Sequence, residues 1–209
     1  MSTTEIPKPA QPRRRLSRAD RQRQLLDQAW QLIRAEGTDA LTLGYLAEKA
    51  GVTKPVVYDH FTTRAGLLAA LYQDFDRRQT ALMDAALATC APRLVDTAQV
   101  IATQYVDCVL TQGKEIPGVI AALASTPELE KTKREYEAIF LEKCRNALLP
   151  FTHGGAITQA GLRAMLGAAE ALSQAAATEE ITAAQARDEL FAVIFALAER
   201  AAKQVTDGT

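Results

Sequence analysis

The segment LAEKAGVTKPVVYDHF, residues 46–61, decides the fold of the chain. Its two halves carry apolar residues at helical spacing, and residues 50–53 between them predict a tight turn. Gly51 favours the left-handed conformation that ends a helix, and Thr53 is a preferred residue at the start of the next helix. The segment therefore predicts a helix-turn-helix.

One helix precedes this unit and a longer helix follows it. Between Ser17 and Gly37 the apolar residues recur at helical spacing, and Ser17 with Asp20 resembles a capping box. Thr62 and Thr63 predict the start of a helix that leads away from the unit. We expect the first three helices to pack around a shared set of apolar residues: Leu26, Trp30, Leu46, Ala47, Val57 and Phe61.

The rest of the chain predicts further helices separated by Pro and Gly turns, so the fold class is all-α. The last two helices, 156–178 and 183–205, are apolar on more than one side. Such a helix needs its own core and a second subunit, so we predict a four-helix homodimer interface. An internal hairpin in a monomer is the alternative. The predicted interface residues are Ala164, Ala168, Ala171, Leu190, Ile194 and Leu197.

Positive charge is concentrated at the N-terminal end of the chain. Residues 1–78 hold 13 Lys and Arg against 9 Asp and Glu, whereas residues 79–209 hold 11 against 16. Seven of the basic residues lie within residues 1–23, beside only Glu5 and Asp20. The N-terminal end is therefore suited to a polyanion, and its first residues predict a flexible basic arm.

Composition excludes several classes of protein. The 209 residues are 48% hydrophobic and 23% charged, which is typical of a globular protein of one or two domains. No apolar run predicts a membrane span or a signal peptide, so we expect a cytoplasmic protein. Cys90, Cys108 and Cys144 are widely spaced, which predicts neither a disulfide framework nor a metal site.

Nothing in the sequence predicts an enzyme. There are two histidines, and no Cys–His arrangement, carboxylate cluster or phosphate-binding glycine loop stands out. We therefore expect no cofactor and no catalytic residues.

Residues from about 21 to 68 resemble the DNA-binding domain of the tetracycline-repressor (TetR) family. The resemblance is carried in register by AEG at residues 35–37, LAEKAGVT at 46–53, YDHF at 58–61 and LL at 67–68. Members of this family are all-helical homodimers. Their helix-turn-helix binds palindromic operators, and their divergent C-terminal domain holds a small effector.

The resemblance implies a ligand-responsive DNA-binding transcriptional regulator, most often a repressor in this family. Its expected parts are a flexible basic arm at 1–16, a helix-turn-helix DNA-binding domain at 17–63 and a helical effector-binding and dimerisation domain at 64–209. Its expected partners are double-stranded operator DNA, a second copy of the chain and a small apolar effector. A ligand-independent DNA-binding scaffold of the same fold is the main alternative, and an all-helical enzyme is disfavoured.

The predicted DNA contacts centre on the helix that begins at Thr53, which would lie in the major groove. We expect Lys54 to bind a guanine or a phosphate and Val56 to pack on a thymine methyl group. The resemblance implies a phosphate contact for Tyr58 and a DNA-facing position for His60. A packed aromatic for Tyr58 and a merely structural or exposed His60 are the alternatives.

Other contacts are expected outside this helix. Thr42 and Thr53 start helices whose free N–H groups suit phosphate oxygens. Arg64 stands where the family usually has Lys, so the resemblance implies a phosphate contact there. Gly44 lacks the long polar side chain with which some relatives touch DNA, and Tyr45 is the candidate that replaces it.

The basic arm also acquires an expected role beside a DNA-binding domain. Arg13, Arg14 and Arg15 directly precede the first helix, and we expect them to enter the minor groove. A tail that adds only non-specific attraction is the alternative.

Candidate effector contacts are aromatic or polar-tipped residues of the middle helices, which suit a largely apolar pocket. Each of them is also explained as a plain core residue. The candidates are Tyr105, Cys108, Tyr136, Phe140, Phe151 and Met165.

Overall fold

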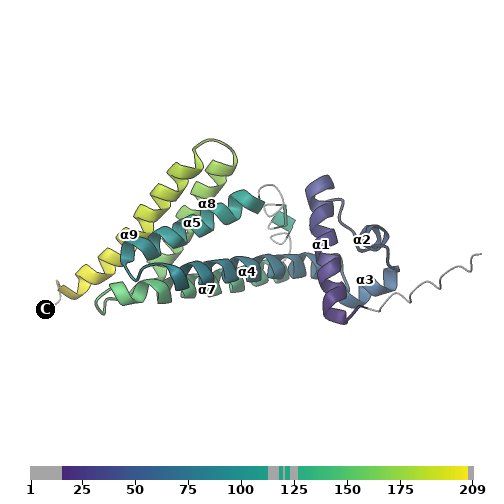
Figure 1. The fold of residues 1–209 in the computed structure, drawn as a ribbon, viewed down its shortest axis with the longest axis horizontal. Helices are drawn as coiled ribbons and strands as arrows, with labels where there is room; N and C mark the ends of the chain where they lie inside the picture. Colours follow the sequence, from purple (N-terminus) through teal and green to yellow (C-terminus); the bar gives the residue numbers. More distant parts are fainter. Residues whose placement is uncertain (1–15, 113–117, 120, 123–126, 207–209) are drawn as a thin grey trace, which may run out of the picture.

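The computed structural model describes residues 16–112, 118–119, 121–122 and 127–206, and over these ranges the chain is helical without a strand. Figure 1 shows a small helical unit at one end and a larger bundle at the other, joined by one long helix. The helices are α1 (Arg18–Glu36), α2 (Leu43–Lys49), α3 (Lys54–Phe61), α4 (Arg64–Thr89), α5 (Leu94–Gln112), α7 (Pro127–Leu148), α8 (Gln159–Ala177) and α9 (Ala183–Thr206), with a short 3₁₀ helix at Leu149–Phe151 after α7. The all-α class with an N-terminal helix-turn-helix is confirmed.

Short-range capping contacts explain where α1 begins and ends. The Ser17 side chain accepts a hydrogen bond from the backbone N–H of Asp20 at 3.1 Å. At the other end Gly37 has a φ of 82°, and its N–H donates to the carbonyl of Ile33 at 2.8 Å. The predicted limits of the first helix are confirmed.

The turn between α2 and α3 also forms as predicted at Gly51, which has a φ of 65°. The start of α3 differs in one respect, since the Thr53 side chain makes no capping hydrogen bond. Pro55, in the first turn of α3, has no N–H to offer it. The N–H of Val56 donates instead to the Thr53 carbonyl at 3.0 Å. The Thr53 hydroxyl is thus left unused within the described parts of the chain.

The three N-terminal helices share one apolar core with the start of α4. All six residues predicted for this core are buried, with at most 5% of each exposed. Val119, from a segment far along the chain, is also fully buried in this core. The ideal Cβ position of the neighbouring Gly118 lies 2.5 Å from Oγ1 of Thr38, in the loop between α1 and α2. The C-terminal part of the chain therefore reaches into the N-terminal unit.

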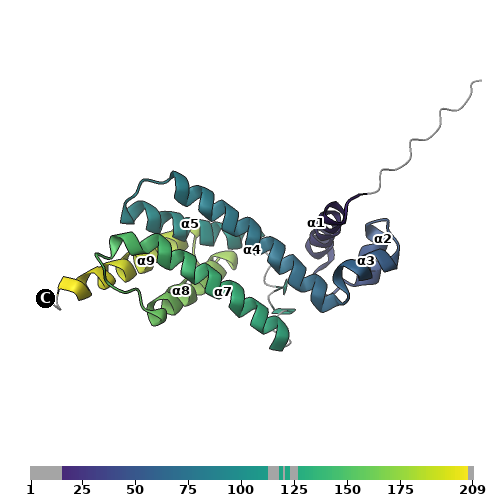
Figure 2. The same ribbon diagram turned by 90° about the horizontal axis from the view of Figure 1, so that it is seen from below.

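The long helix α4 runs from the N-terminal unit into the bundle, as the view in Figure 2 also shows. There α5, α8 and α9 pack on one another around a second core, and α7 packs against α4, α5 and α8. Among the described helices none is both long and apolar enough to cross a membrane.

The predicted interface residues of α9 face the core of their own subunit, whereas those of α8 do not. Leu190, Ile194 and Leu197 are 1%, 0% and 5% exposed, because α9 packs these side chains against α5 and α8 of its own subunit. They are therefore core residues of the subunit and offer no surface to a partner. On α8, Ala164 and Ala171 are exposed and Ala168 is partly exposed.

Candidate functional site

The exposed face of α3 lies at the end of the molecule opposite the C-terminal bundle (Figure 1). Val57 and Phe61 turn inward to the core, whereas Lys54 and Tyr58 are exposed and Val56 is partly exposed. Tyr58 is 51% exposed, and its hydroxyl makes no hydrogen bond to a described residue. The packed-aromatic alternative for Tyr58 therefore does not apply in this structure.

The Lys54 side chain of α3 lies beside Gly44 of α2. A Cβ atom at Gly44 would lie 3.5 Å from Cε of Lys54 and 3.9 Å from its Nζ. The end of the Lys54 side chain is thus within contact distance of the α2 backbone at this position. Position 44 has no polar side chain, but the ammonium group of Lys54 from α3 lies beside it.

The end of α3 is joined to the start of α1. The Arg18 guanidinium donates to the backbone carbonyl of Asp59 at 3.0 Å. Burial, and then the nearby Arg18 charge, lower the pKa of His60. His60 is therefore neutral at neutral pH, and can donate one hydrogen bond and accept another. Arg13, Arg14 and Arg15 lie outside the described residues, but the chain that follows them enters α1 beside the end of α3.

Two of the residues expected to contact DNA make hydrogen bonds within the N-terminal unit. The Tyr45 hydroxyl donates to the Glu36 carboxylate at 2.9 Å, and Lys49 Nζ lies 5.0 Å from the Tyr45 ring centre. Arg64 is partly buried. It donates from Nε to the Leu41 carbonyl and from a terminal nitrogen to the Thr38 carbonyl, each at 2.8 Å.

Arg64 thus joins the loop between α1 and α2 to the start of α4, and its expected phosphate contact stays a prediction. A guanidinium can bind two carbonyl oxygens at once, and the loop between α1 and α2 presents two such oxygens to the start of α4. Thr42 is likewise engaged, because its hydroxyl oxygen accepts from the N–H of Tyr45 at 3.1 Å.

A cavity of about 130 Å³ lies in the C-terminal bundle, between α4, α5, α7 and α8. Four of the six candidate effector residues line it: Tyr105, Cys108, Tyr136 and Phe140. Met165 does not, because it is packed in the core with 2% exposed, and its neighbour Leu166 lines the cavity instead. Phe151 lies in the 3₁₀ helix after α7, away from the lining.

Sequence reasoning missed the wall of the cavity that α4 supplies, because it treated α4 only as a connector. The missed residues recur at three- and four-residue spacing, which indicates one face of a helix. They are Tyr72, Phe75, Asp76, Gln79, Thr80 and Met83.

Charged groups occupy one side of this cavity. Lys133 donates to Glu137 at 3.0 Å and lies 3.6 Å from Glu170, while Arg163 donates to Glu137 at 2.7 Å. Burial alone would raise the pKa of Glu137, but the hydrogen bonds from Lys133 and Arg163 outweigh burial and hold it below its usual value. This carboxylate is therefore ionised and fully engaged at neutral pH.

Aromatic rings occupy the remainder of the wall. Tyr72 and Tyr136 meet edge to face with ring centres 5.4 Å apart, and Tyr105 and Phe140 are also 5.4 Å apart. Burial raises the pKa of both Tyr72 and Tyr105, and raises that of the Cys108 thiol to about 12. These hydroxyl and thiol groups are therefore neutral at physiological pH, and Cys108 is not a reactive thiolate there.

Neither region resembles a metal centre. Within the described residues no three His, Cys, Asp or Glu side chains are grouped so that they could hold an ion.

Comparison with known families gives one match. Residues 25–71 match the model for bacterial regulatory proteins of the tetR family. The matched range includes most of α1, all of α2 and α3, and the first turns of α4. No curated protein matches the chain.

Solved structures share the fold over most of the chain. A transcriptional regulator from Rhodococcus sp. assigned to the TetR family has a TM-score of 0.70 at 20% identity, over 87% of this chain and 100% of that one. The fatty acid degradation regulator FadR from Bacillus halodurans has a TM-score of 0.68 at 14% identity, over 83% and 97%. A transcriptional regulator from Pseudomonas aeruginosa has a TM-score of 0.72 at 14% identity, over 91% and 96%. At such identities the likeness concerns the fold.

Proposed function

We propose that this chain is a DNA-binding transcriptional regulator of the TetR family, and that it acts as a repressor that binds a palindromic operator as a homodimer and leaves it when a small effector fills the cavity. The proposal implies a cytoplasmic location, with the DNA that it binds. The observation that carries it is the sharing of two side chains: Tyr72 and Tyr136 line the cavity and also pack against the core of the helix-turn-helix unit.

The DNA-binding part of the proposal rests on the exposed face of α3. Lys54 and Tyr58, four residues apart, offer a cation and a hydroxyl on one flank of this helix, and Val56 and the neutral His60 offer an apolar contact and an imidazole on the other flank. These groups suit a mixture of base-edge and phosphate contacts in a major groove. The unused Thr53 hydroxyl at the start of α3 is a further phosphate donor.

The basic arm is proposed to extend this surface. Arg18 is tied to the end of α3, so the residues before it join the domain beside the recognition helix. Arg13, Arg14 and Arg15 would then follow the DNA from the major groove into the adjacent minor groove. If the complex neutralises about 6 to 10 phosphates, its affinity falls by orders of magnitude between low and moderate salt.

The homodimer is proposed to form through the exposed side of α8, together with the outer side of α9. Ala164 and Ala171 are seven residues apart, so they lie on one exposed face of α8. Small side chains permit close approach of a partner helix. On α9 the ring pair of Phe191 and Phe195, with centres 5.7 Å apart, is only partly buried in the subunit and adds apolar area beside this face.

Ligand response is proposed to follow from differential affinity. The dimer would exist in two conformations, one with its recognition helices spaced for the operator and one with them spaced too far apart. An effector that binds the second conformation more tightly lowers the affinity for the operator, at most by the ratio of the effector's affinities for the two conformations. Because α4 forms one wall of the cavity and also begins in the N-terminal core, a shift of α4 would reach the recognition helix directly.

Selection of binders from a random DNA pool at near-physiological salt tests the proposal. The expected result is one two-fold symmetric motif in the retained sequences. Retention of DNA without any shared motif would favour the ligand-independent scaffold, and retention of none would contradict DNA binding by the free protein.

A further inference from the structure

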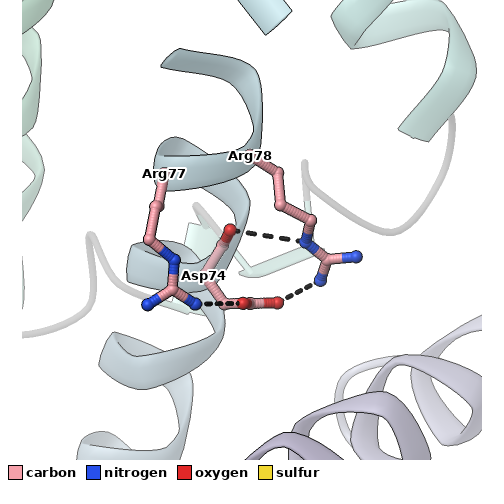
Figure 3. A network of polar contacts seen from close by, with 3 residues as sticks. All are labelled: Asp74, Arg77 and Arg78. Atoms are coloured by element: carbon pink, nitrogen blue, oxygen red, sulfur yellow. Dashed lines mark hydrogen bonds and ion pairs between the residues drawn. The ribbon is translucent and has the colours of Figure 1, made fainter. Parts of the chain in front are cut away.

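One acidic side chain in the cavity wall forms no ion pair with another described residue. Asp74 and Asp76 both lie on α4, two residues apart. Figure 3 shows Arg77 and Arg78 converging on Asp74, whose carboxylate accepts from Arg77 at 2.6 Å and from Arg78 on its other oxygen. Asp76 lines the cavity and forms no hydrogen bond or ion pair with any described residue. Asp76 is therefore a partly buried carboxylate without an ion pair among the described residues, and the only cation acting on its charge is Lys143, which is itself paired with Asp84.

The other charges at the cavity are already compensated. Lys133 lies between Glu137 and Glu170, as described above. The second lining ammonium, that of Lys143, is paired with Asp84, which does not line the cavity. Both cations of the wall thus have carboxylate partners, and the wall carries one more acidic than basic group. An anion entering the cavity would have to displace a carboxylate, whereas a cation would meet Asp76 unpaired.

The shape and lining of the cavity restrict the ligand further. Tyr72, Tyr105, Tyr136 and Phe140 supply ring faces and edges, and the face of an aromatic ring attracts a cation. The volume of about 130 Å³ resembles that of an engineered apolar cavity known to hold one benzene ring. Gln79 and Gln104 line the same space without hydrogen bonds to described residues. Their amide groups can therefore form hydrogen bonds with a polar substituent of the ligand.

We propose that the cavity binds a compact organic cation, an amine of about one ring in size, whose ammonium group pairs with Asp76 among the aromatic side chains. This inference replaces the small apolar effector expected from the sequence, and it rests on the proposed function in taking the cavity as the effector site. Burial raises the pKa of Asp76, with Lys143 opposing the rise, so pairing with a ligand cation would offset the cost of burying this carboxylate.

Three probes of nearly the same shape and different charge test the inference: 2-phenylethylamine, 2-phenylethanol and phenylacetate. Their binding is measured by calorimetry on the full chain without DNA. We expect the amine to bind at least about tenfold more tightly than the alcohol, since a hydrogen bond to a charged group contributes about 1.5–3 kcal/mol. Phenylacetate should bind more weakly than the alcohol.

Two variants with the same chemical change identify the responsible carboxylate. Asp76→Asn keeps the size of the side chain and should abolish the preference for the amine over the alcohol. Asp74→Asn, on the same helix but away from the cavity, should retain that preference. The inference is overturned if phenylacetate or the alcohol binds as tightly as the amine, if Asp76→Asn binds the amine like the wild type, or if the amine does not bind at millimolar concentration.

A second readout separates this inference from the proposed function. The same amine is added to the complex of the protein with its selected DNA. Binding in the calorimeter without release of DNA would uphold the cation site and contradict the ligand-responsive part of the function. Selection of a symmetric motif together with no amine binding would uphold DNA binding and contradict the cation site.

Discussion

The ring of Tyr136 on α7 packs edge to face on the ring of Tyr72 on α4, with an interplanar angle of 72°. Both rings border the cavity, and both also touch the core of the helix-turn-helix unit. A ligand that displaces either ring therefore changes the packing of the DNA-binding unit without an intermediate element.

Replacing Tyr136 should separate ligand binding from DNA release. Allosteric coupling commonly changes affinity by about 5- to 150-fold, and Tyr136→Ala should bring this factor for 2-phenylethylamine close to one. The factor is the ratio of DNA affinities with and without saturating amine. Phe140→Ala is the matched control, because Phe140 lines the cavity but packs on the second core. Phe140→Ala should weaken amine binding, but at saturating amine the ratio of DNA affinities should remain that of the wild type. Equal factors in both variants would contradict this route.

Arg64 should matter for stability more than for DNA contact. Arg64→Met leaves the Leu41 carbonyl without its donor and leaves the Thr38 carbonyl with the Leu41 N–H alone, so we expect a loss of about 1–3 kcal/mol in the free energy of unfolding. Urea unfolding at one fixed protein concentration measures it. Arg77→Met, which removes an exposed arginine, should change stability by less than about 0.5 kcal/mol. If Arg64→Met bound DNA more weakly at unchanged stability, the result would instead support a contact between Arg64 and a DNA phosphate.

Asp76→Asn should stabilise the protein near neutral pH. Burial raises the folded-state pKa of Asp76, so its contribution to stability is complete below the unfolded pKa and is lost as pH rises through the folded pKa. The charged group facing it is Lys143 on α7, while Cys108 on α5 and Tyr72 remain neutral. The gain of the variant over the wild type in thermal unfolding should therefore shrink as pH falls. A gain independent of pH would show that the charge is not its cause.

The exposed face of α8 should carry the dimer. Ala164→Arg combined with Ala171→Arg places two charges on a surface that the subunit leaves open, so we expect folded monomers by light scattering with an unchanged helical spectrum. Ala138→Arg, at an exposed position of α7, is the control and should remain dimeric. Arginine at Leu190 or Ile194 would not make this test, because both are buried in the subunit core. A dimer that survives the α8 changes would place the interface elsewhere.

The helix-turn-helix was predictable because its determinants are local. Gly51 ends α2, and Ser17 and Thr63 cap the helices they precede, through contacts between residues two to four positions apart. The inward positions of Val57 and Phe61 follow from the helical period alone. Residues that cap or end a helix through contacts with near neighbours can be recognised in a sequence without knowledge of the tertiary fold.

What escaped prediction depends on contacts between distant segments. The partners of Arg64 lie 23 and 26 residues away in the chain, and a basic residue before a helix does not reveal them. Helix α9 is apolar on several sides, so the spacing of its apolar residues does not indicate which side faces its own subunit. The contribution of α4 to the cavity, including Asp76, became visible only once α5, α7 and α8 were packed around it.

The affinity of the protein for a full selected operator, compared with a duplex of the same length in which one half-site is scrambled, tests the central claim most directly. Two recognition helices held in one dimer should bind the full site at least about a hundredfold more tightly at near-physiological salt, because loss of several base pairs at about 1–3 kcal/mol each removes most of the specificity. Equal affinity for the two duplexes would contradict the account, since it would show that one subunit alone recognises the DNA.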